Sequence, residues 1–247
     1  MSVRKKCDTV IAVCVQEPTE DGSCMDLGII KGDDLRFLHQ AFITDTVANA
    51  LEVAAADTRL YHIDDPDRKR LVRTALDYLE KKLDGKRLEG LHERFAQIEQ
   101  DREGWGFRMS RAFTDCFAAG YKNVLVIGSR TPTITPDMMK TAIKMLKESD
   151  AVFGPTPEGR YYTIGMSGSY QIDLAQFDWK SSSIYSQVAD AFSERKLSWS
   201  ELEIWYAVES SEYLELMARD INQYRFEGDE FTAHETEVVI ERILARL

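Results

Sequence analysis

Short, continuous apolar runs along the chain are separated by longer stretches in which apolar residues recur at helical spacing. The runs at 9–15 (TVIAVCV) and 123–129 (NVLVIGS) contain almost no polar residues. Strands buried on both faces of a parallel sheet have this composition, because helices cover both of their faces. Further strands are expected at 58–64, 94–99, 151–155, 160–166 and 200–209.

The longer stretches predict amphipathic helices between these strands. Asp33 or Asp34 is expected to cap a helix that runs through residue 55. Thr135, Pro136 and Asp137 supply an N-cap, a proline at the first helical position and an acid in the first turn. Other helices are expected at 67–83, 105–120, 182–196, 210–221 and 232–247, the last with a threonine cap and the helix at 105–120 ended by Gly120.

The expected strands at 151–155 and 160–166 have no helix between them, so the sheet is predicted to be mixed. The fold class is therefore α/β, with a Rossmann-like, mostly parallel sheet and helices on both faces. No repeat or linker divides the sequence, and 247 residues with 44% hydrophobic content suffice for one core. We expect a single domain spanning residues 1–247.

Charge narrows the expected partners. The chain has 31 basic and 42 acidic residues, for a net charge of -11. Such a chain repels a nucleic-acid backbone and an anionic membrane surface, so neither is an expected partner. The four cysteines form no CxxC pair or regular framework, which predicts reduced thiols and a cytoplasmic protein. No segment approaches the roughly 20 apolar residues of a membrane span.

Residues 104–188 carry a family resemblance. The segments GWGFRMSRAFTDCFAAGYKNVLVIGSRTPTITPDMM, DAVFGPTPEGRYYTIGM and FDWKSSSIYSQV, together with FITDTV at 42–47, resemble glycosyltransferase-A-like proteins of largely uncharacterised function. These proteins are related to nucleotidyltransferases such as the lactyl-phosphate guanylyltransferases. The resemblance implies a nucleotide-diphospho-sugar transferase fold, a nucleotide or nucleotide-sugar ligand, and a divalent metal, Mg or Mn, if the family chemistry survives.

The sequence departs from this family where the chemistry is expected. The family has an aspartate, placed for a metal or for sugar hydroxyls, at the position of Arg130. Arg160 replaces a glycine of the family. In the late segment AVESS, Ala207 replaces one aspartate and Glu209 takes the place of another. The loop after the first strand, basic and Gly-rich in the family, is acidic here. The resemblance thus implies an altered metal site, and no protein metal ligand is assigned.

Arg130 has two interpretations. A transferase must neutralise a pyrophosphate leaving group, and ligands of open α/β sheets bind beyond the carboxyl ends of strands, where Arg130 falls. Its guanidinium could replace the metal as a bidentate donor to a phosphate. Alternatively, Arg130 is a surface arginine that pairs with an acid in a pocket that no longer works. Both interpretations stay open.

Five further residues complete the candidate ligand-binding set. Ser129 precedes Arg130, and Glu158 with Tyr161 form either a polar rim for a hydroxylated ligand or part of a strand. Trp179 and Ser181 belong to a turn whose hydroxyls either contact substrate or cap the next helix. No histidine is singled out, and the catalytic residues are left unassigned.

Two functions remain open at this point. One is a glycosyltransferase- or nucleotidyltransferase-like protein with an altered metal site. The other is a non-catalytic ligand-binding or regulatory protein on the same scaffold. Enzymatic activity is therefore undecided from the sequence, as are donor, acceptor and oligomeric state. Fold analogy does not choose between the two.

Overall fold

The computed structural model describes residues 7–18, 24–63, 68–82, 90–168 and 172–246, and these contain one seven-stranded sheet in the order β3-β2-β1-β4-β6-β5-β7. Strands β1, β2, β3 and β4 are mutually parallel, and β6 runs antiparallel to both β4 and β5. Short β7 is parallel to β5. In chain order the strands are β1 (Thr9–Cys14), β2 (Asp57–His62), β3 (Phe95–Glu99), β4 (Asn123–Gly128), β5 (Ala151–Pro155), β6 (Tyr161–Ser167) and β7 (Trp199–Glu201).

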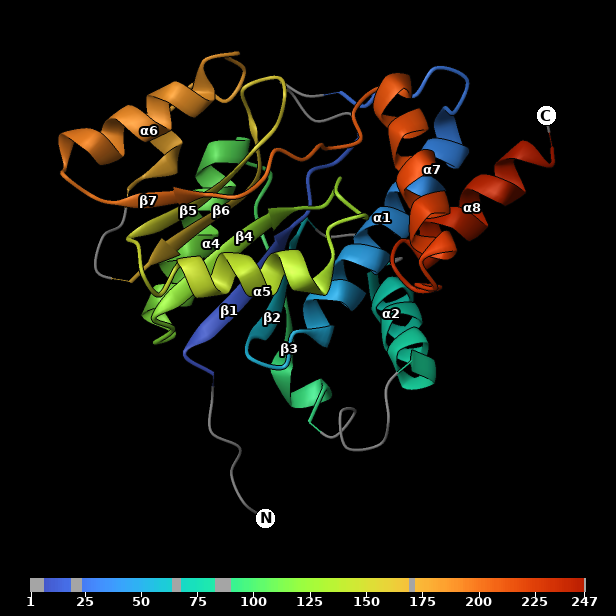
Figure 1. Ribbon diagram of the computed structural model, residues 1–247, viewed down its shortest axis with the longest axis horizontal. Coiled ribbons are helices and arrows are strands. Elements are labelled where there is room, and N and C mark those ends of the chain that lie inside the picture. Colours follow the sequence, from blue (N-terminus) through green and yellow to red (C-terminus); the bar gives the residue numbers. More distant parts are fainter. Residues whose placement is uncertain (1–6, 19–23, 64–67, 83–89, 169–171, 247) are drawn as a thin grey trace.

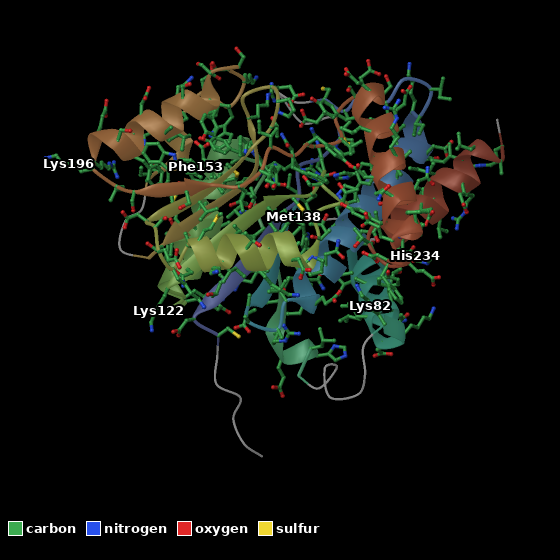
Figure 2. All side chains as sticks on the ribbon, in the orientation of Figure 1. Lys82, Lys122, Met138, Phe153, Lys196 and His234 are labelled. Atoms are coloured by element: carbon green, nitrogen blue, oxygen red, sulfur yellow. The ribbon has the colours of Figure 1, made fainter. Side chains whose placement is uncertain are left out.

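Helices cover both faces of this sheet (Figure 1). One core lies between the sheet and α1, α2 and α5, and another between the sheet and α4 and α6. Phe153 of β5 packs against Phe192 in the second core, with ring centroids 5.2 Å apart (Figure 2). The helices are α1 (Gly32–Glu52), α2 (Arg68–Lys82), α4 (Trp105–Ala118), α5 (Pro136–Met145), α6 (Ile184–Glu194), α7 (Ser211–Phe226) and α8 (His234–Leu244), with short 3-10 turns at His92–Arg94 and Leu174–Gln176.

Strand β4 occupies an interior position, as its apolar run predicts. It lies between parallel β1 and antiparallel β6, and residues Val124 to Ile127 are at most 2% exposed. The expected α/β fold with a mixed, mostly parallel sheet is therefore confirmed. The cap of α5 is confirmed as well, because the Thr135 side chain accepts a hydrogen bond from the Met138 N–H at 3.2 Å.

The strand expected at 200–209 is confirmed only at its first two residues, Ser200 and Glu201, and is wrong beyond them. Pairing of β7 with β5 stops at Glu201, and the chain then crosses the end of the sheet. The Leu202 N–H donates to the Phe153 carbonyl at 2.8 Å, and the Val208 N–H donates to the Arg130 carbonyl at 2.8 Å. Trp205, Tyr206 and Val208 of this segment pack into cores beside the sheet, whereas Ile204 is 63% exposed, and the segment makes no ladder with the described strands.

Two expected helix caps are also wrong. Helix α1 begins after Lys31, and Asp33 and Asp34 lie in its first turn. Helix α8 begins after Ala233, which is left-handed (φ 58°), so Thr232 is not its cap. Helices α7 and α8 share a third core with the first half of α1. Pro66, which predicts a turn between the expected strand at 58–64 and the expected helix at 67–83, lies outside the described residues, as do residues 19–23 of the first loop.

Among the described residues, no helix has the length and apolar character needed to cross a bilayer.

Candidate functional site

A cavity of about 460 Å³ lies at the carboxyl ends of β1 and β4. The chain continues from β1 to β2 and β3 on one side and returns to β4 on the other, so the strand order reverses there. Ligands of open α/β sheets bind in the crevice at such a switch point. The lining residues form three groups. The first lies at the strand ends and contains Gln16, Gly128, Ser129, Arg130 and Thr131. The second is Gly104 to Phe107 at the start of α4, and the third, across from the strand ends, contains Arg160 to Tyr162, Ala175, Phe177 to Lys180, Ile184, Ala207 and Glu209.

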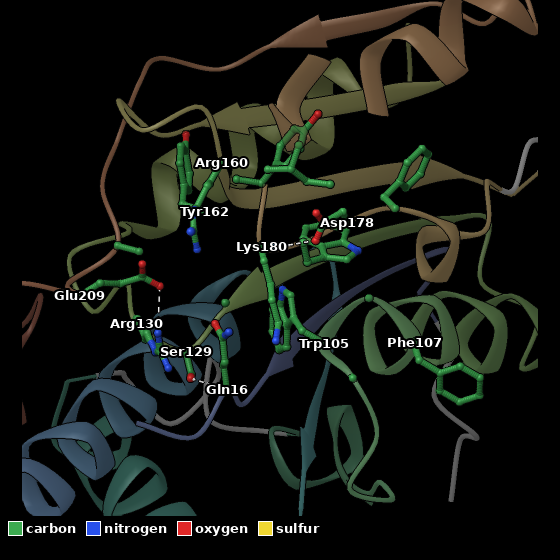
Figure 3. A pocket seen from close by; sticks show the side chains of 18 of the residues that line it. Gln16, Trp105, Phe107, Ser129, Arg130, Arg160, Tyr162, Asp178, Lys180 and Glu209 are labelled. Carbon is green, nitrogen blue, oxygen red and sulfur yellow. Dashed lines mark hydrogen bonds and ion pairs between the residues drawn. The ribbon is translucent and has the colours of Figure 1, made fainter. Parts of the chain in front are cut away.

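Arg130 is buried at the base of this cavity. Its guanidinium donates to the Glu209 Oε1 at 2.9 Å and to the Glu17 carbonyl at 2.6 Å. The Arg130 side chain is 3% exposed and that of Glu209 is 30% exposed. Arg130 is therefore not a surface arginine, because the segment that follows β7 covers it, but it does pair with an acid, as the second interpretation expected. Arg130 joins the ends of β1 and β4 to the segment that carries Ala207 and Glu209 (Figure 3).

Ser129 is fully buried beside Arg130 and is held from two sides. Its Oγ accepts a hydrogen bond from the Gln16 N–H at 3.2 Å and lies 3.3 Å from Nε2 of His39, which is buried on α1. Sequence reasoning did not single out His39, since no motif surrounds it. Thr131 also lines the cavity, and its buried hydroxyl has no hydrogen-bond partner among the described residues.

Aromatic side chains form the wall across from the strand ends. The Trp179 indole N–H donates to the Leu174 carbonyl at 2.8 Å, and a Cβ at residue 106 would lie 2.3 Å from that indole nitrogen. Gly106 is thus required for Trp179 to approach α4. The Tyr161 hydroxyl donates to the Tyr185 carbonyl at 2.9 Å. Burial raises the pKa of Tyr161 far above its usual value, so this phenol stays protonated at neutral pH.

Four of the six expected ligand-binding residues line the cavity: Ser129, Arg130, Tyr161 and Trp179. The other two lie elsewhere. Glu158 is exposed in the turn between β5 and β6. The Ser181 hydroxyl accepts from the Ser183 N–H at 3.1 Å just before α6, which favours a local structural role.

The cavity also contains polar residues that the sequence did not identify. Gln16, Arg160, Asp178 and Lys180 line it, and Figure 3 shows Arg160 and Lys180 extending toward Gln16 from the opposite wall. Two of these four residues, Arg160 and Lys180, nevertheless have a recognisable feature in the sequence. Arg160 replaces a glycine of the resembling family, and Lys180 directly follows Trp179 in the shared turn.

The lining residues do not fit a metal site. Among the described residues, the carboxylates that line the cavity are Asp178 and Glu209. Glu209 faces Arg130, and the Oδ1 of Asp178 accepts the Lys180 N–H at 3.0 Å. Ala207 offers no ligand atom. The described chain has no group of three or more His, Cys, Asp or Glu placed to hold a metal ion, whereas Mg²⁺ requires oxygen ligands.

Comparison with known proteins identifies the scaffold. Residues 63–181 match the family model described as "Uncharacterized protein conserved in bacteria (DUF2064)". A protein of Desulfovibrio desulfuricans G20, provisionally described as a nucleotide-diphospho-sugar transferase, superposes with a TM-score of 0.67 at 21% identity, over 96% of this chain and 98% of that one. The chain has the nucleotide-diphospho-sugar transferase fold. No curated protein matches the sequence.

More distant structures share this fold. A cytidylyltransferase from Leptospira borgpetersenii superposes with a TM-score of 0.53 at 10% identity, over 97% of this chain and 96% of that one. The 4-diphosphocytidyl-2C-methyl-D-erythritol synthase of Anaerococcus prevotii gives 0.50 at 11% identity, over 88% and 96%. The similarity to a transferase fold of uncharacterised function, expected from residues 104–188, is therefore confirmed.

Proposed function

We propose that this chain binds a nucleotide or nucleotide-sugar in the cavity and is a glycosyltransferase- or nucleotidyltransferase-like protein with an altered metal site. One observation carries the proposal. The buried Arg130 and its half-buried partner Glu209 lie at the switch point of the sheet, where the resemblance places an aspartate for a metal or sugar hydroxyls. With an arginine in the place of that aspartate, a phosphate bound in the cavity would depend on protein cations instead of a metal ion.

The aromatic wall and the volume of the cavity support a ligand of this class. A cavity of about 460 Å³ falls within the range typical of small-molecule sites. Trp105, Phe177 and Trp179 supply apolar surface, and polar groups lie at the strand ends across from them. A ligand with an aromatic base or sugar at one end and phosphates at the other matches this division.

The non-catalytic alternative is supported by the state of the ionisable side chains. The Glu209 carboxylate is engaged by the Arg130 guanidinium. Burial keeps Tyr161 and Tyr162 protonated by raising the pKa of each phenol. His39 is 3% exposed behind Ser129. General acid–base transfer needs a group whose pKa lies near the working pH, and burial moves the pKa of both Tyr161 and Tyr162 away from neutral pH.

A ligand panel tests the proposal. The melting temperature is measured with nucleoside triphosphates and nucleotide-sugars, once with EDTA and once with MgCl2. We expect at least one compound to raise the melting temperature, and to do so in EDTA, because the ligand stabilises the folded state that binds it. Phosphorus NMR of the same mixtures separates the two functions, since an active transferase can pass the group to water, and cleavage of the donor then gives a new phosphorus resonance. If no nucleotide or nucleotide-sugar shifts the melting temperature under either condition, the proposal is wrong.

A further inference from the structure

Two cations in the cavity have no side-chain partner among the described residues. Arg160 is half-buried and Lys180 is exposed, and both line the cavity. Their backbone N–H groups are bonded, but neither side chain makes a hydrogen bond or ion pair with another residue of the described chain. This is unexpected in a chain of net charge -11, in which acidic residues outnumber basic ones.

The third cation of the cavity is engaged differently. Arg130 lies against Glu209, which offsets its charge, and the pair is held by the segments around it. An incoming anion would compete with Glu209 for Arg130. Arg160 and Lys180 carry no such competitor among the described residues, so the attraction for an anion is concentrated on them.

The backbones that carry Arg160 and Lys180 are fixed next to each other. The Thr156 N–H donates to the Arg160 carbonyl at 2.9 Å, which closes the turn between β5 and β6. The Gly159 carbonyl accepts from the Tyr185 N–H at 3.1 Å, which ties that turn to α6, just after Lys180. Gly159 has φ 72°, and a Cβ there would lie 2.8 Å from the Ser182 carbonyl oxygen. This close approach holds the two loops together.

We propose that Arg160 and Lys180 form an anion subsite that binds a diphosphate group without a divalent cation. The planar guanidinium can donate two parallel hydrogen bonds to one phosphoryl group, and the ammonium can contact the next. In Figure 3 the two side chains extend from one wall toward Gln16 and Ser129. The inference deepens the proposed function by assigning the phosphates to residues other than Arg130.

The size of the expected effect follows from charged hydrogen bonds. A hydrogen bond to a charged group changes affinity by roughly tenfold to hundredfold when one partner is removed. The exposed Lys180 is expected near the low end, with about a tenfold loss for Lys180→Gln. Arg160→Gln is expected to lose more, since it removes a bidentate donor. The double variant should weaken binding by about a hundredfold or more.

Titration calorimetry with inorganic pyrophosphate in EDTA tests the subsite. The proteins are the parent, Arg160→Gln, Lys180→Gln and the double variant. Arg219→Gln and Lys144→Gln are matched controls, because both residues are exposed, line no described pocket, and make no side-chain hydrogen bond or ion pair with another residue of the described chain. Each control removes the same charge as its counterpart. We expect the parent and both controls to bind pyrophosphate without metal, and the cavity variants to lose affinity.

Two results would overturn the subsite. One is a parent protein that binds pyrophosphate only when Mg²⁺ is added. The other is binding in EDTA that the double variant retains while its melting temperature matches the parent. A repeat with a nucleotide that the parent binds separates the two proposals. Unchanged nucleotide affinity in the double variant refutes the subsite and leaves the nucleotide-binding function standing. Metal-free pyrophosphate binding that depends on both residues supports the subsite even if no nucleotide binds.

Discussion

At the scale of single residues, Arg130 is the side chain whose environment differs most from its expected one. Its position after β4 followed from the sequence, because an apolar run that ends in Gly-Ser predicts the end of a buried strand. Its burial did not follow, because the covering residues 202–209 come from a distant part of the sequence. The pairing of Arg130 with Glu209 did not follow either, because the two residues are 79 positions apart in the sequence.

The burial of Arg130 predicts a cost for breaking its ion pair. Glu209→Ala leaves a guanidinium that is 3% exposed without its carboxylate, and losing one partner of a buried pair costs about 3 kcal/mol or more. The free energy of unfolding in urea measures this. Lys140→Ala is the control: it breaks a pair of similar length, 2.8 Å, whose side chains are 52% and 87% exposed. We expect a loss below about 1 kcal/mol there.

Replacing both partners gives a sharper comparison. Arg130→Met combined with Glu209→Leu removes the charges together, and well-packed apolar substitutes for a buried pair are often near neutral. We expect this double variant to be more stable than Glu209→Ala alone. Equal losses for Glu209→Ala and Lys140→Ala would show instead that water screens Arg130.

Arg160 and Lys180 illustrate what a single sequence leaves open at this scale. Both were visible, one as a replaced glycine and the other in the turn after Trp179. Their convergence depends on the contact between Gly159 and Ser182, which joins two loops through backbone atoms. Backbone contacts of this kind leave little trace in the pattern of side chains. Glu158, which directly precedes Gly159 in the same turn, is exposed and does not line the cavity.

At the scale of elements, local signals predicted the structure well where local forces decide it. Strand β4 and helix α5 have the expected places, and Thr135 caps α5 as its sequence requires. The errors occur where a distant segment supplies the hydrogen bonds. Residues 202–208 alternate like a strand, but the partner beyond Glu201 is absent from the described sheet. Helix α8 receives its cap from α1.

That cap is made by Asp45, which is buried within α1. Its two carboxylate oxygens accept the N–H groups of Glu235 and Thr236 at 3.1 and 2.8 Å, in the first turn of α8. The left-handed Ala233 turns the chain so that these N–H groups face α1. Burial raises the pKa of Asp45 to about 7, against the lowering effect of the hydrogen bonds it accepts from Thr236 and Glu235.

The raised pKa predicts how stability changes with pH. An unfolded aspartate has a pKa of about 3.9, so between this value and about 7 the folded protein holds a proton that the unfolded chain has released. The contribution of Asp45 to the free energy of unfolding is therefore full below pH 4. It falls as the pH rises to about 7, by at most about 1.4 kcal/mol per pH unit.

Asp45→Asn isolates this contribution. Asparagine cannot ionise and keeps one of the two acceptor oxygens, so we expect the variant to be less stable than the parent at pH 4.5. The difference should shrink as the pH approaches 7.5. Urea unfolding at four or five pH values measures it. A difference that stays constant, or that grows with pH, would show that the N-terminus of α8 keeps Asp45 ionised throughout.

At the scale of the whole molecule, the net charge of the chain and the net charge of the cavity lining have opposite signs. The chain carries a net charge of -11, while the described Asp, Glu, Lys and Arg residues that line the cavity are Arg130, Arg160, Lys180, Asp178 and Glu209. The cavity is thus locally cationic in an acidic protein. Composition alone excluded nucleic acid as an expected partner. It could not reveal this local reversal, because the cations come from the loop after β4, the turn before β6 and the loop before α6.

The same distribution predicts weak affinity for divalent cations. Acidic surface residues attract Mg²⁺ diffusely, and salt screens that attraction over about 8 Å at physiological ionic strength. Tight binding needs several converging oxygen ligands, and in the described cavity Glu209 faces Arg130 while Ala207 supplies none. Calorimetry with MgCl2 or MnCl2 in about 0.15 M salt, without nucleotide, should therefore show no stoichiometric binding tighter than the millimolar range.

Glu209→Ala serves as the comparison, since it removes a carboxylate from the cavity. Saturable binding of one ion per chain, abolished in Glu209→Ala, would contradict the prediction and would mean that Glu209 exchanges Arg130 for a metal.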